Sequence, residues 1–347
     1  MSILLFDMKN LALLIWLLLL LSTPLSNRLN EQWSAENKSD KKIPFKLRRN
    51  LIYLNAKVAD TIDTQLVFDT GCPYLILDSL LYAQKIGLVD TLKKALISGI
   101  GDFHDTVRFC AEQMGYSIGS NKQKVGSYIV MNVNTLLNRR QIAGGLVGAN
   151  FIGNRRVVID YKNSVIEFLS RSKKHIGKRV GSGFLNADNG IMMPMIPLEI
   201  RVKGKITIKG NFLIDLGSSH GIILTAETAK AYNLKETVFH LNEQEVRGIG
   251  GVAKLKHFMA DSLFVCDYKY GDVGVKYSTN EAGALSKAPF VGTVGNDFLK
   301  NFKVEIDFGQ GIVWLQEEKF NTGISPNPYV ASALSPTRAY YPPAQKF

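Results

Sequence analysis

The same series of short motifs occurs twice in this chain of 347 residues. Asp69 precedes Gly148 by 79 residues, and Asp215 precedes Gly295 by 80. A fixed order of motifs at near-constant spacing indicates two copies of one folding unit. We therefore expect residues 41–170 and residues 195–317 to form two similar units. The matched segments are 43–47 with 196–200, 66–71 with 212–217, 99–101 with 248–250, 145–152 with 292–299, and 158–161 with 305–308.

Each unit has the pattern of a mostly β fold. Short apolar and β-branched runs, bounded by Gly, Asn and Asp, predict strands at 51–58, 65–68, 127–133 and 157–168. Helices are expected only at 80–86 and 225–232, with a short helical turn at 134–140. At 46%, the apolar content is typical of a globular chain and excludes a disordered one.

The N-terminal end has the features of a targeting segment. The apolar run at residues 11–21 is shorter than the ~20 residues that a membrane-spanning helix needs, and Ser, Thr and Pro follow it. Residues 1–26 are predicted to be a cleaved signal peptide, so the mature protein would be secreted or periplasmic. A membrane anchor at residues 11–25 is the alternative. Residues 27–40 are expected to be a polar leader.

Two further segments are expected to lie outside the units. Residues 171–194 are rich in Gly, Lys and Arg and are predicted to be a linker. Residues 318–347 carry five prolines and are predicted to be an extended tail, because proline is excluded from helix and sheet interiors. The net charge is +12, and the basic linker is either solvated or in contact with an anionic membrane surface. No motif for nucleic-acid binding accompanies the charge.

An apolar run ends at Asp-x-Gly in both units, at Asp69 and Asp215. A single Asp-Thr-Gly indicates only a tight turn after a strand. Its recurrence one repeat later is more informative, because equivalent residues of two similar units can meet at a pseudo-two-fold axis.

Both loops resemble the active-site loops of aspartic proteases, and the Gly-Leu-Val-Gly and Gly-Thr-Val-Gly segments resemble the element beneath those loops. The two Gly-Ile-Gly segments resemble the flaps of the bacterial retropepsin-like branch; they comprise Gly99, Ile100, Gly101, Gly248, Ile249 and Gly250. The resemblance covers most of residues 43–316. It implies a mostly β fold of two pseudo-two-fold-related retropepsin- or pepsin-like β-barrel lobes, with an active-site cleft between them, in a monomeric chain.

The resemblance also implies the chemistry. Two carboxyl groups held together share one proton, so the ionised member activates a water molecule while the protonated member polarises the scissile carbonyl of a peptide or protein substrate. Asp69 and Asp215 are then the catalytic residues of an endopeptidase that needs no metal and no cofactor. Thr70, Gly71, Gly217 and Ser218 would support the loops, with Thr70 hydrogen-bonded to the opposite loop. The flaps would close over a peptide bound as an added strand.

Two residues depart from the family pattern. Leu216 stands where the family has Thr or Ser, and Cys72 stands where Ser or Ala is usual. A catalytically inactive, retropepsin-like peptide-binding protein is therefore the second hypothesis.

A third hypothesis is a serine hydrolase that uses Ser219, since residues 217–221 fit Gly-x-Ser-x-Gly. That motif requires a helix directly after it, whereas Ile222, Ile223 and Leu224 favour a strand. The five histidines show no metal-ligand spacing. Cys110 and Cys266 are expected to be buried free thiols.

Overall fold

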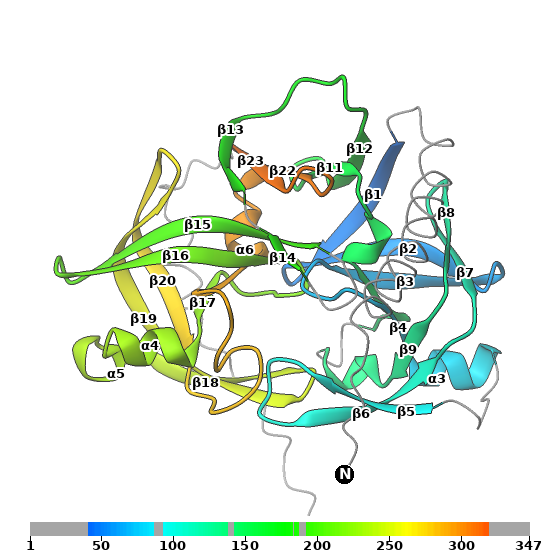
Figure 1. Ribbon diagram of the computed structural model, residues 1–347, viewed down its shortest axis with the longest axis horizontal. Coiled ribbons are helices and arrows are strands. Elements are labelled where there is room, and N and C mark those ends of the chain that lie inside the picture. Colours follow the sequence, from blue (N-terminus) through cyan, green and yellow to red (C-terminus); the bar gives the residue numbers. More distant parts are fainter. Residues whose placement is uncertain (1–40, 87–92, 138–141, 183, 187–191, 319–347) are drawn as a thin grey trace, which may run out of the picture. The chain divides into compact units, whose positions relative to one another are not determined.

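The structure is a computed structural model that describes residues 41–86, 93–137, 142–182, 184–186 and 192–318. The expected signal peptide and polar leader lie outside these residues, as does the tail beyond Glu318. Within the described part the chain is mostly β (Figure 1). None of its helices combines the length and the apolar character needed to cross a membrane.

The first unit consists of strands with a few short helical segments. The predicted helix at 80–86 forms as a single α-turn followed by a π-helical turn, and the predicted strand at 157–168 is two strands joined by a turn. The strands are β1 (Lys41–Arg48), β2 (Leu51–Val58), β3 (Ile62–Asp69), β4 (Leu75–Asp78), β5 (Lys93–Ser98), β6 (His104–Cys110), β7 (Met114–Ile118), β8 (Asn121–Val125), β9 (Tyr128–Met131), β10 (Gly145–Gly148), β11 (Arg156–Asp160) and β12 (Val165–Leu169). The helical segments are α3 (Ser79–Leu81), η1 (Tyr82–Ile86), η2 (Val133–Thr135) and η3 (Ala149–Phe151).

The second unit has longer hairpins. Its predicted helix at 225–232 forms as α4 (Ala226–Ala231), with Thr225 as the N-cap that accepts a hydrogen bond from the Thr228 N–H at 3.2 Å. The other helices are α5 (Leu234–Thr237) and α6 (Asn296–Leu299). The strands are β15 (Met192–Val202), β16 (Ile206–Asp215), β17 (Ile222–Leu224), β18 (Asn242–Gly248), β19 (Gly251–Val265), β20 (Tyr268–Ser278), β21 (Gly292–Gly295), β22 (Phe302–Asp307) and β23 (Ile312–Glu317).

The sequence repeat corresponds to a repeated pattern of strand pairing. In the first unit β10 is parallel to β3 and antiparallel to β4, which is parallel to β9. In the second unit β21 is parallel to β16 and antiparallel to β17, which is parallel to β20. The register is also shared, because Asp69 pairs with Gly148 and Asp215 with Gly295.

Glycine at these two positions has a steric reason. A Cβ atom on Gly148 would lie 2.0 Å from the carbonyl oxygen of Cys72, and one on Gly295 would lie 2.4 Å from that of His220. No side chain fits such approaches. Gly148 and Gly295 therefore let strands β10 and β21 pass directly beneath the two Asp-x-Gly loops.

The two units share one sheet. Strand β11 of the first unit pairs antiparallel with β22 of the second, and Val158 faces Glu305, its counterpart in the repeat. One continuous hydrophobic cluster also contains buried side chains from both units. The units are thus joined by backbone hydrogen bonds as well as by apolar packing.

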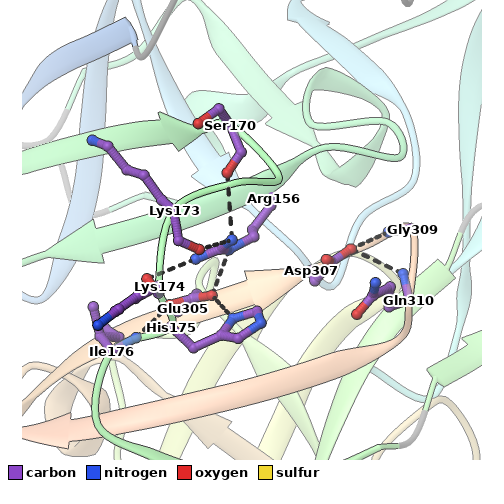
Figure 2. A network of polar contacts seen from close by, with 10 residues as sticks. All are labelled: Arg156, Ser170, Lys173, Lys174, His175, Ile176, Glu305, Asp307, Gly309 and Gln310. Carbon is purple, nitrogen blue, oxygen red and sulfur yellow. Dashed lines mark hydrogen bonds and ion pairs between the residues drawn. The ribbon is translucent and has the colours of Figure 1, made fainter.

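A buried ion pair crosses this shared sheet (Figure 2). The Arg156 Nε donates to Glu305 Oε1 at 2.6 Å, and the two side chains are only 3% and 0% exposed. The same guanidinium donates to the carbonyl oxygens of Ser170, Lys173 and Lys174. The other oxygen of Glu305 accepts the N–H of Ile176 at 2.9 Å. The pair therefore attaches residues 170–176, which follow β12, to the sheet that the two units share.

The predicted linker at 171–194 contains regular structure. Strands β13 (Lys178–Ser182) and β14 (Phe184–Asn186) lie within it, and β13 pairs with β23. The ring of His175 stacks on Trp314 at a centroid distance of 3.8 Å. Lys178 forms an ion pair with Asp267 at 2.8 Å. Part of the basic segment is thus attached to the second unit rather than forming a solvated connection.

Candidate active site

The two repeated aspartates end equivalent strands. Asp69 is the last residue of β3 and Asp215 the last residue of β16, and the three residues before each are buried. Both aspartates are themselves partly exposed. The apolar runs anchor each strand in the core. Each carboxyl group is thus held at the end of its strand, where it is partly exposed.

The carboxyl groups of Asp69 and Asp215 are neighbours, because a Cβ atom placed on Gly71 would lie within 3.2 Å of an oxygen of each. The Gly71 N–H donates to Asp69 Oδ1 at 2.8 Å, and the Gly217 N–H donates to Asp215 Oδ1 at 3.0 Å. A Cβ atom on Gly71 would lie 3.1 Å from Asp215 Oδ1, and one on Gly217 only 2.3 Å from Asp69 Cγ. The lack of side chains at both glycines lets each loop approach the carboxyl group of the other.

Burial raises the pKa of both carboxyl groups above their ordinary value of 3.8, and the negative charge of Asp69 adds to the rise in the pKa of Asp215. The loop N–H groups act in the opposite direction, because they stabilise the ionised form. Two carboxyl groups in contact resist double ionisation. The pair therefore keeps one proton at pH values where an isolated aspartate has lost it, and offers one proton donor beside one proton acceptor.

Thr70 connects the two loops. Its side chain is completely buried, and its hydroxyl donates to the carbonyl oxygen of Ile214 at 2.7 Å. The same oxygen accepts the N–H of Leu216 at 3.1 Å. One hydroxyl of the first loop thus binds the backbone on both sides of Asp215.

Replacing Thr70 by Val is expected to destabilise the protein by about 1–3 kcal/mol, because a buried N–H and a buried carbonyl lose their partner. Denaturant unfolding measures this change. Thr70→Ser keeps the hydroxyl and serves as the control, so its unfolding midpoint should stay near that of the parent. Equal losses in both variants would contradict the assignment.

The second loop carries a different set of contacts. Leu216 is completely buried and offers no hydroxyl to the first loop. Its carbonyl oxygen accepts the side-chain N–H of Asn296 at 2.6 Å, and Tyr161 in turn donates its hydroxyl to Asn296 Oδ1 at 2.7 Å. Ser218 takes part through its carbonyl oxygen, which accepts from the Asn296 side chain at 3.2 Å. Its hydroxyl accepts the His220 N–H at 3.3 Å.

Asn50 also reaches the second loop from the first unit. It lies in the turn between β1 and β2 with a φ of 60°, a conformation that Asn tolerates. Its side-chain N–H groups donate to the Ser219 carbonyl at 3.2 Å and to Asp297 Oδ1 at 2.9 Å. Sequence reasoning missed Asn50, Tyr161 and Asn296. The one available signal was that Asn296 is polar where its repeat counterpart is Ala149.

The three cysteines are free. Cys72 is buried beside the carboxyl pair, and burial together with the charge of Asp69 raises the pKa of its thiol. Cys110 is also buried, as expected, but Cys266 is exposed, so the expectation of a buried thiol there is wrong. It follows the end of β19 with a positive φ of 51°, at the tip of the β19–β20 hairpin.

In the folded protein we expect only Cys266 to react rapidly with a thiol reagent, because the thiolate is the reactive species and must be accessible. A chromogenic disulfide reagent measures the stoichiometry and rate. Cys266→Ser should abolish the rapid phase, whereas Cys72→Ala should leave it intact. A rapid phase that survives Cys266→Ser would contradict this prediction.

The two Gly-Ile-Gly segments meet each other. They lie between β5 and β6 and between β18 and β19, which run close together in Figure 1. The Gly101 N–H donates to the Ile249 carbonyl at 3.2 Å, and the Phe103 N–H donates to that of Gly250 at 3.0 Å. The Gly250 N–H donates to Asp105 Oδ2 at 2.7 Å. A Cβ atom on Gly101 would lie 2.1 Å from the Gly250 carbonyl, so this contact requires glycine.

Each segment also packs against the opposite unit. Ile249 contacts the first-unit cluster that includes Cys72 and Ile76. Ile100 contacts the second-unit cluster formed by buried residues that include Ile223 and Leu255. Cys72 is three residues from Asp69. The second-unit segment therefore reaches the apolar side chains that surround the first Asp-x-Gly loop.

The other candidate sites have less support. Strand β17 follows Gly221, so the Gly-x-Ser-x-Gly segment lacks the directly following helix of a nucleophile elbow. Burial and the charge of Lys276, which lies 3.1 Å from His220 Nδ1, lower the pKa of His220 to about 3. Among the described residues, no three His, Cys, Asp or Glu side chains are grouped as a metal site.

Comparison with known proteins adds no family assignment. No protein-family model matches the chain. A search of curated proteins likewise finds no match.

Proposed function

We propose that this protein is an aspartic endopeptidase whose two repeated units act as fused retropepsin-like lobes. One observation carries the proposal: two partly exposed carboxyl groups, from equivalent strand ends of a duplicated unit, lie next to each other, and each is beside the glycine of the opposite loop. The repeated pairing of β3 with β10 and of β16 with β21 supports it. Perturbed carboxyl pairs at an accessible edge are typical of catalytic sites.

In the proposed mechanism, a water molecule binds between Asp69 and Asp215. The ionised carboxylate removes a proton from this water, which attacks the scissile carbonyl carbon, while the protonated carboxyl donates a hydrogen bond to the carbonyl oxygen. Collapse of the tetrahedral intermediate transfers a proton to the leaving nitrogen. The pair acts as a unit, so neither residue has a fixed role.

The Gly-Ile-Gly segments are the proposed flaps. They would part to admit an extended peptide and close on it, with backbone groups pairing as in strand addition. The cross-packing of Ile100 and Ile249 supports coupled movement, because each tip is anchored on the opposite unit.

A catalytically inactive peptide-binding protein is the second candidate. The observation that favours it is Leu216. Thr70 binds the second loop through its hydroxyl, but Leu216 has no hydroxyl with which to bind the first loop in the same way. It differs from the first proposal in one measurable respect: such a protein binds peptides without cleaving them.

The test uses the full chain and a diverse peptide library between about pH 3 and 7, the acidic range in which such carboxyl pairs work. Mass spectrometry detects the products. Cleavage that disappears in Asp69→Asn supports the endopeptidase. Cleavage that survives there but disappears in Ser219→Ala indicates the serine hydrolase instead. Binding without cleavage by the unmodified chain supports the second candidate.

A further inference from the structure

A buried hydrogen-bond relay runs from the first unit to the second Asp-x-Gly loop. The Tyr161 hydroxyl donates to Asn296 Oδ1 at 2.7 Å. The Asn296 side-chain nitrogen donates to the carbonyl oxygens of Leu216 at 2.6 Å and of Ser218 at 3.2 Å. Asn296 is 0% exposed and Tyr161 is 6% exposed. An amide offers two N–H donors and one carbonyl acceptor, so every kind of polar group on Asn296 has a partner.

The relay holds the peptide group that contacts the catalytic carboxyl. Leu216 and Ser218 flank Gly217, whose N–H donates to Asp215 Oδ1 at 3.0 Å. The backbone N–H of Asn296 adds a further bond to the Ser218 carbonyl, at 3.0 Å. With both neighbouring carbonyls fixed, the direction of the Gly217 N–H is fixed as well.

The relay has no second copy at the equivalent positions of the repeat. The repeat counterpart of Asn296 is Ala149, and that of Tyr161 is Phe308; both are buried and neither has a polar side chain. Within the loops the polar residue is in the other unit: the first loop has the hydroxyl of Thr70, and the second has the apolar Leu216. The side-chain amide is therefore found beneath the loop that has Leu216 at the position of Thr70.

We propose that Asn296 and Tyr161 are positioning residues that hold the Gly217 N–H against the Asp215 carboxylate. They do this for the second loop, where Leu216 provides no side-chain hydrogen bond. The inference rests on the proposed endopeptidase function for its kinetic consequences. Neither residue touches the carboxyl pair, so both act through the backbone of residues 216–218.

The sign of the expected effect follows from the bond they orient. The Gly217 N–H lowers the pKa of both Asp215 and Asp69, because it stabilises the ionised form of each. A looser loop weakens this bond and raises the pKa at which the pair first ionises. The acid limb of the activity profile should then move to higher pH, since activity requires one ionised carboxyl.

Tyr161→Phe removes only the hydroxyl and is the decisive variant. We expect kcat to fall about five- to tenfold, as for loss of one buried hydrogen bond, with little change in KM and with the acid limb shifted upward. Asn296→Leu should give a larger loss in kcat and a larger shift. If Asn296→Leu fails to fold, Tyr161→Phe alone decides.

Tyr116→Phe is a closely matched control. The Tyr116 hydroxyl donates to Gln123 Oε1 at 2.8 Å, and Gln123 donates to the Phe151 carbonyl at 2.7 Å. This relay has the same chemistry and similar burial, but it contacts neither Asp-x-Gly loop. Its loss should lower the unfolding midpoint without moving kcat or the acid limb. If Tyr161→Phe behaves in the same way, the positioning role is refuted.

A second readout separates this inference from the proposed function. NMR titration of ¹³C-labelled aspartate carboxyls reports the pKa of the pair whether or not the protein cleaves peptides. An upward shift of the first ionisation in Tyr161→Phe, absent in Tyr116→Phe, supports the relay even if no cleavage is found. An unchanged titration overturns it even if the unmodified protein is an active peptidase.

Discussion

Asp215→Asn is expected to lower kcat/KM for a peptide substrate by at least ~10³-fold, because the amide can neither accept a proton from water nor share one with Asp69. Because each carboxyl group lies beside the glycine of the opposite loop, next to the other carboxyl group, this is the largest single effect on activity that we expect. Asp69→Asn should cost as much. The double variant should be no worse than either single one, since the two groups act as a unit.

Asp63→Asn is the matched control for these substitutions. Asp63 lies on the same strand as Asp69, its side chain is 83% exposed, and it forms an ion pair with Lys57 at 2.9 Å. Surface pairs of this kind contribute little. Activity should therefore stay at the parental level. A comparable loss in Asp63→Asn would show that the assay reports folding rather than chemistry.

The carboxyl pair also gives stability a defined pH dependence. Because the pKa of both groups is raised in the folded state, this pair binds more protons in the folded protein than in the unfolded chain above about pH 4. The contribution of the pair is fully present below the unfolded pKa of 3.8 and is lost as pH rises through the folded values. Asp215→Asn should flatten this decline, which denaturant unfolding between pH 4 and 8 would reveal. A slope equal to that of the parent would contradict the raised pKa.

Arg156→Met is expected to destabilise the fold by about 3–5 kcal/mol, the usual result of removing one partner from a buried ion pair. Glu305 is 0% exposed and would lose the guanidinium at 2.6 Å, keeping the His175 imidazole, also at 2.6 Å, and the Ile176 N–H. The carbonyl oxygens of Ser170, Lys173 and Lys174 would lose their donor at the same time (Figure 2). Equilibrium unfolding in denaturant measures the change.

Two variants control this measurement. Asp267→Asn breaks the exposed pair with Lys178 and should cost less than ~1 kcal/mol. Arg156→Met combined with Glu305→Leu removes both charges and should recover part of the loss, because no buried charge is left alone. A cost below ~1 kcal/mol for Arg156→Met alone would mean that the pair does not hold the shared sheet.

The repeat is what made the candidate site predictable. Matched spacings from Asp69 to Gly148 and from Asp215 to Gly295 predicted that the two aspartates occupy equivalent places, and the structure pairs each with its glycine. The strand at residues 51–58 and the helix near residues 225–232 followed from local patterns of apolar and capping residues. These features depend on residues that are close in the sequence, and the repeat shows the pattern around each aspartate twice.

Other features depend on contacts that no local pattern contains. Tyr161 lies in a turn after a buried strand, and only the pairing of β11 with β22 brings it toward the second unit. Residues 171–194 resemble a solvated linker because they are basic and rich in Gly. In the described residues 175–182 the structure comes from distant partners instead, namely Glu305, Trp314 and strand β23. The sequence showed that the two loops differ at Leu216. That Asn296 binds the backbone of the second loop could be seen only in the coordinates.

That asymmetry means that the two units are no longer interchangeable. A symmetric dimer of the second unit would place Leu216 against Leu216, with no hydroxyl to bridge its loops, and Phe308 where Asn296 now meets Tyr161. A dimer of the first unit would have two threonines but Ala149 beneath each loop. The hydroxyls of Thr70 and Tyr161 both come from the first unit and both serve the second loop, so neither homodimer would reproduce the contacts that the fused chain brings together.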